Sequence, residues 1–138
     1  MPTTFTALVD SLEALTVTGV TKRYTAGPPA QLNSADLPAQ WCDLPRGEER
    51  PAYAGAGGLD RTLTVDLLIA VEAVGQNLRI NNWPAVVALM DSIATALRTW
   101  DQTTAPLTGP CTWRSRLAVA NIGGSDYWAV VTEISGLG

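Results

Sequence analysis

The sequence contains no histidine and only two cysteines, Cys42 and Cys111. Without histidine the chain lacks the commonest general base and the commonest ligand of transition metals. Two thiols alone cannot complete a structural zinc site, and their separation matches no metal-binding spacing. We therefore expect no metal, no cofactor and no disulfide framework, and we expect both cysteines to be buried free thiols, as in a reducing compartment.

Charge is also sparse, because charged residues make up 16% of the 138 residues and the formal net charge is −4. This acidic balance argues against nucleic-acid binding, which needs a basic surface. No apolar run approaches the roughly 18 residues of a membrane span, and the N-terminal stretch lacks the basic start and cleavage site of a secretory signal. The hydrophobic content of 46% favours one globular domain over residues 1–138.

Two amphipathic helices are predicted from apolar residues that recur at helical spacing. The first extends from Phe5 to Leu15, where Thr3 or Thr4 can cap its start. The second carries an apolar stripe from Val86 to Trp100, and Asn82 is the expected capping residue before Trp83-Pro84.

Strands are predicted where β-branched residues cluster or the apolar period becomes two. The predicted segments are Val17 to Thr25, a short piece within Asp36 to Pro45, Asp60 to Val74, Thr112 to Ala120 and Asp126 to Ile134, with a hairpin turn over Asn121 to Ser125. Arg46 to Gly58 is predicted to be a long loop or hairpin arm. The order α-β-β-β-α-β-β favours a single α+β domain, an antiparallel sheet of four to five strands with both helices on one face.

The stretch DLPAQWCDLP, from Asp36 to Pro45, contains a tryptophan and two leucines. Its two prolines prevent it from forming a helix. We expect a short strand beside the sheet, with Trp41 packed on the body and Leu37 and Leu44 closing the turns. Contact of Trp41 with a partner protein is the alternative that the sequence leaves open.

Candidate catalytic groups are few, and each has a simpler interpretation. Gly55-Ala-Gly-Gly58 lacks the lysine of a phosphate loop and precedes a strand rather than a helix. Glu48 and Glu49 stand between arginines, as in a solvated loop, and Cys42 has no histidine to activate it. Asp66 and Glu72 on the long strand are the remaining candidate catalytic residues. No enzymatic activity is expected.

The element order, together with Leu37-Pro38-Ala39 ahead of Trp41, resembles the tail terminator (tail completion) proteins of long-tailed, siphovirus-like bacteriophages. In that family a helix, an early strand and a long loop precede such a Leu-Pro-Ala segment. A charged loop, a long strand, one helix and a C-terminal hairpin follow.

The resemblance implies a structural virion protein of the tail and neck region, assembled in the host cytoplasm. Its subunits form a ring, usually of six, which caps the tail tube protein and joins it to the head–tail connector protein. DNA passes through the lumen without sequence-specific binding, and the family has no catalytic residues. An acidic balance suits such a channel, since like charge prevents phosphate contacts.

The candidate partner-contacting residues lie on the predicted arm and just ahead of the second helix: Arg46, Glu48, Glu49, Arg50, Tyr53, Arg79 and Trp83. Two other functions remain open. One is a different head–tail connector component, such as a stopper or head completion protein. The other, from a different class, is a small cytoplasmic α+β domain that binds a ligand between its helices and its sheet.

Overall fold

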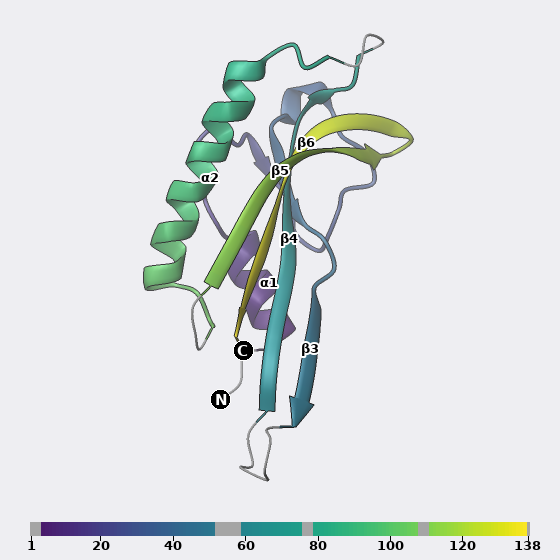
Figure 1. The fold of residues 1–138 in the computed structure, drawn as a ribbon. Coiled ribbons are helices and arrows are strands. Elements are labelled where there is room, and N and C mark those ends of the chain that lie inside the picture. The colour runs from purple at the N-terminus through teal and green to yellow at the C-terminus, as the bar shows by residue number, and fades with distance from the viewer. Residues whose placement is uncertain (1–3, 52–58, 76–78, 108–110, 138) are drawn as a thin grey trace.

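The computed structural model describes residues 4–51, 59–75, 79–107 and 111–137. In chain order the elements are α1 (Phe5–Glu13), β1 (Lys22–Arg23), the 3-10 helix η1 (Ser34–Asp36), β2 (Ala39–Cys42), β3 (Arg46–Pro51), β4 (Leu59–Ala73), α2 (Trp83–Thr103), β5 (Cys111–Ile122) and β6 (Ser125–Leu137). They form one α+β domain, so the predicted fold class is confirmed (Figure 1).

The six strands form one mixed sheet in the order β1-β2-β4-β6-β5, with β3 also paired to β4. Strand β4 is its centre, because β6 lies on one side while β2 and β3 share the other side in succession. Cys42 of β2 pairs with Leu67, and Arg46 of β3 pairs with Thr64. All neighbouring strands are antiparallel except β1 and β2, which pair in parallel over two residues.

Both helices cover one face of the sheet, as predicted (Figure 1). The alternation along β4 places its apolar side chains under the helices, where they join the stripes of α1 and α2 in the main core. That core includes Leu8, Leu12, Leu63, Val65, Leu67, Ile69, Val86, Leu89, Ile93 and Leu97, none of which is more than 5% exposed.

A smaller apolar cluster occupies part of the opposite face, beneath the segment that precedes β2. Trp41 is 1% exposed there and packs in the same cluster as Leu32 and Tyr127, whose hydroxyl donates to the Leu32 carbonyl at 3.2 Å. The packing interpretation of Trp41 is therefore correct within this chain. The expected role of Leu44 is wrong: its side chain is 88% exposed.

The helix starts show one capping prediction that holds and one that does not. The Thr4 hydroxyl accepts the Ala7 N–H at 3.0 Å and so caps α1. Asn82 precedes α2 but makes no side-chain cap. Instead Glu72 of β4 accepts the backbone N–H groups of Asn81 and Asn82 at 2.9 and 3.1 Å, which ties the entry of α2 to the sheet.

Three predicted segments differ in the structure. Of Val17 to Thr25 only Lys22–Arg23 is a strand, because the chain turns at Gly19, whose φ is 94°. Within the predicted loop or hairpin arm, Arg46–Pro51 is strand β3, paired antiparallel with β4 and not a loop, and residues 52–58 of the arm lie outside the described residues. The turn between β5 and β6 is only Gly123-Gly124, with φ values of 61° and 83°, so Asn121 and Ile122 extend β5.

Candidate interaction surface

The sheet face opposite the helices changes character along its strands. Near Trp41 it is apolar and covered, but toward the start of β4 the same face carries polar side chains, most of them exposed. We call this polar half the open face; its residues are Arg46, Glu48, Thr62, Thr64, Asp66, Thr112, Arg114, Arg116, Glu133 and Ser135. Its side chains come from four strands, β3, β4, β5 and β6.

An ion-pair group ties three strands of the open face together. Arg46 Nη1 lies 3.3 Å from Asp66 Oδ2, and Arg46 Nη2 lies 2.9 Å from Glu133 Oε2. The Thr64 and Ser135 hydroxyls hydrogen-bond beside it at 3.0 Å. Because the Arg46 side chain is 52% exposed, these ion pairs contribute little to stability. Their effect is to hold Arg46 against β4 and β6.

Burial is the main cause of the raised pKa values of Cys42, Asp43 and Cys111. Burial, with Asp66 nearby, raises the pKa of Asp43. Burial, with Glu13 and Asp43 nearby, raises the pKa of the Cys42 thiol to about 12, and burial raises that of Cys111 to about 11. Both cysteines are free, as expected, but only Cys42 is buried, whereas Cys111 is partly exposed. Neither is a reactive thiolate near neutral pH.

The predicted arm residues are separated onto two faces of β3. Glu48 is exposed on the open face with Arg46, whereas Glu49 forms an ion pair with Arg61, which stacks over the Phe5 ring at 5.6 Å. The backbone of Arg50 pairs with Asp60. The Arg50 side chain and all of Tyr53 lie outside what the structure describes.

Gly47 explains why β3 fits so closely under α1. A Cβ at this position would lie 2.6 Å from Phe5 Cζ and 3.0 Å from the Thr62 carbonyl oxygen. A larger residue would force the Phe5 ring or β3 to move. The position therefore favours glycine for close approach, not for turn formation.

The other two predicted contact residues lie away from the open face. Arg79 is exposed ahead of α2. Trp83, the first residue of α2, is 60% exposed, and Val87 one helical turn later is 43% exposed. Since α2 covers the opposite side of the sheet, the predicted residues do not form one contiguous site.

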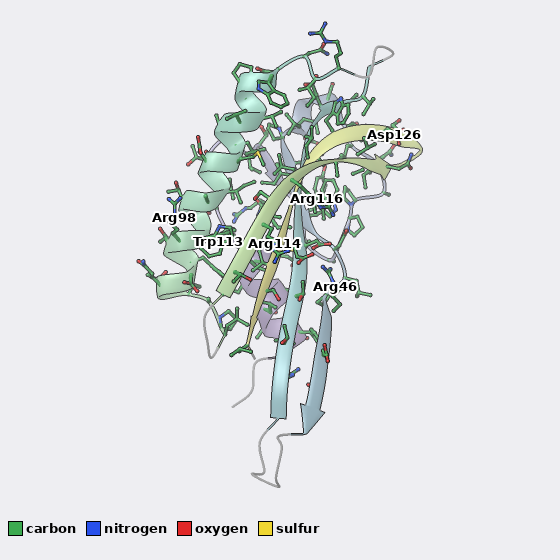
Figure 2. All side chains as sticks on the ribbon, viewed as in Figure 1. Arg46, Arg98, Trp113, Arg114, Arg116 and Asp126 are labelled. Carbon is green, nitrogen blue, oxygen red and sulfur yellow. The ribbon has the colours of Figure 1, made fainter. Side chains whose placement is uncertain are left out.

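Arg114 and Arg116 of β5 are the basic open-face residues that sequence reasoning missed (Figure 2). Neither forms an ion pair with a described residue, although Arg114 is directly opposite Glu133 in the register. The signal was present in the alternation Trp113-Arg114-Ser115-Arg116-Leu117, in which two arginines share one face of a strand. Such a pattern indicates a solvent-facing side.

A hollow with a volume of about 580 Å³ lies on the helix side, between α1 and α2. Hydroxyl-bearing residues dominate its lining, and Asp91 is the one ionisable residue among those that line it. Ser92, Thr99 and Thr103 donate their hydroxyls to carbonyls of their own helix. Few polar groups therefore converge on this hollow, which is a weak basis for a ligand site.

The two candidate catalytic carboxylates both have structural partners. Asp66 forms an ion pair with Arg46, and Glu72 accepts a backbone N–H at the start of α2. Within residues 4–51, 59–75, 79–107 and 111–137, no three His, Cys, Asp or Glu residues gather as metal ligands. Across that same part of the chain, no helix has the length and apolarity to cross a membrane.

In comparisons with known proteins, no family model and no curated protein matches the chain.

Proposed function

We propose that this chain is the tail terminator of a long-tailed bacteriophage, a structural protein without catalytic activity. Its subunits form a ring, six in the proteins that it resembles, which caps the tail tube and joins it to the head connector. The proposal is supported by the order of elements and by the Leu37-Pro38-Ala39 segment, which leads directly into β2 and the buried Trp41.

The observation that carries the proposal is the projection of β3 and β4 beyond the body of the domain (Figure 1). Among the described residues, Thr62 is the first β4 residue paired with β6, whereas Leu59, Asp60 and Arg61 pair with β3. A two-stranded extension of this kind presents backbone beyond the rest of the sheet. Such an extension suits an element that reaches a partner along the ring axis, such as the tail tube.

Purified protein examined by negative-stain microscopy and native mass spectrometry tests the proposal. We expect rings with a central hole and a mass that is a whole multiple of the 14.6 kDa subunit. Particles that remain single subunits at every concentration, with or without tail tubes, would contradict it. Such a result would favour the ligand-binding domain instead.

A further inference from the structure

We propose that neighbouring subunits join by pairing the free edge of β5 in one copy with the free edge of β3 in the next. This inference rests on the proposed ring and specifies its interface. Strand β5 ends the sheet, with β6 as its one partner among the described strands, and β3 pairs there with β4 alone. Each therefore exposes a row of backbone groups suited to another strand.

The strand directions favour a head-to-tail arrangement of copies. The successive pairs β3–β4, β4–β6 and β6–β5 are all antiparallel, so β5 runs opposite to β3. The two strands lie on opposite sides of the domain (Figure 1). A second copy placed beside β5 in the same orientation therefore continues the sheet with an antiparallel pair. Repeating this heterologous contact closes a ring when the rotation between copies allows it.

One register pairs the whole of β3 with the first half of β5. If Arg46–Pro51 pairs with Cys111–Arg116 of the neighbour, Glu48 lies directly opposite Arg114, and both face the open side. Within one domain Glu48 pairs with Thr62 of β4, whereas Arg114 is aligned, across β6, with Asp66 of β4. The copies are therefore displaced by four residues, about 13 Å along the strand. Closed rings of tilted strands carry such a stagger.

The charges on the two edges are complementary in this register. Among the described side chains, the β3 side carries Asp43, Glu48 and Asp66 against Arg46, while the facing part of β5 carries Arg114 and Arg116. Arg46 would lie opposite Arg116, but its charge is already offset by Asp66 and Glu133. The arrangement gives the two unpaired β5 arginines nearby carboxylates.

Pairing of β5 with β5 of a second copy is disfavoured by the same arginines. A two-fold axis near Ser115 would place Arg114 opposite Arg116 twice, because antiparallel partners share a face. Like charges directly opposite each other destabilise a sheet. In that register β5 repels its own copy, whereas the β3 side offers Glu48 opposite Arg114.

Charge reversal tests the interface, with the assembly midpoint concentration measured by sedimentation velocity. Arg114→Glu and Glu48→Arg each create a like-charged pair, so each is expected to raise the midpoint about tenfold. The double variant Glu48→Arg/Arg114→Glu is expected to assemble within about threefold of wild type, as is an equal mixture of the two single variants. Arg98→Glu makes the same charge change on the exposed surface of α2 and is the matched control (Figure 2).

The outcomes separate this interface from the proposed function. If wild-type rings form but Arg114→Glu assembles like Arg98→Glu, or if the double variant does not recover, the β5–β3 interface is wrong and the ring stands. If wild-type protein forms no ring, the proposed function fails and the interface fails with it. All substituted side chains are exposed, so unchanged circular dichroism is expected throughout.

Discussion

Replacing Leu67 by alanine is expected to lower the free energy of unfolding by about 2–5 kcal/mol. Leu67 is 0% exposed at the centre of β4 and belongs to the core shared by both helices. Truncation removes buried methyl groups and leaves a cavity between the sheet and the helices, and the regular elements around it limit collapse. Urea denaturation followed by circular dichroism gives the change.

Leu44→Ala is the matched control, because it deletes the same atoms at a position that is 88% exposed. Its effect is expected to stay within about 0.5 kcal/mol. Equal denaturation midpoints for the two variants would show that the helix-facing side of β4 has been assigned incorrectly.

Deleting Glu48 to Gly57 is expected to abolish tail completion while leaving the domain folded. Gly47 and Leu63 are paired in the sheet, so Gly58 to Thr62 would remain as a five-residue connection between them. The described residues among those deleted are absent from the main core. The deletion removes the projecting part of β3, including Glu48, so the proposed ring would lose the edge that faces its neighbour.

Tail lengths in micrographs of phage carrying the deletion provide the measurement. We expect tails of irregular length without heads, alongside a protein whose circular dichroism resembles wild type. Replacing the same residues with a Gly/Ser stretch of equal length is the control for spacing, and it is expected to fail as well. Tails of normal length in the deletion strain would mean that the arm is only a connection.

The elements that follow from local pattern are the ones that the sequence predicts well. The stripes of α1 and α2 and the alternation of β4 bury the expected residues because each pattern matches its own period and faces one core. Strand β3 is different: Arg46-Gly-Glu-Glu-Arg-Pro51 has little strand propensity. It is a strand because β4 offers it a full row of backbone partners, and its charges are tolerated at an edge.

Long-range contacts account for the other differences. The start of α2 is held by Glu72, a residue of the preceding strand, and no local rule links it to Asn81 and Asn82. The β-branched run from Val17 looked like a strand, but Gly19 turns the chain and Val17 enters the core instead. Both outcomes depend on where the sheet lies.

The candidate surface was only partly predictable for the same reason. The arm residues Arg46 and Glu48 are exposed on the open face, as a contact element requires, but Glu49 pairs with Arg61 within the domain. Arg114 and Arg116 gain importance only from the position of β5 at the end of the sheet. Strand order is a property of the whole fold, and one strand's sequence does not state it.

Immunogold labelling of purified particles of the phage proposed to carry this chain tests its location directly. An antibody against a tag placed after Gly138 is used on intact particles and on tails released from heads. We expect a single cluster of gold at the head-proximal end of each tail. Gold along the whole tail, gold at the distal tip, or particles that lack the protein would contradict it.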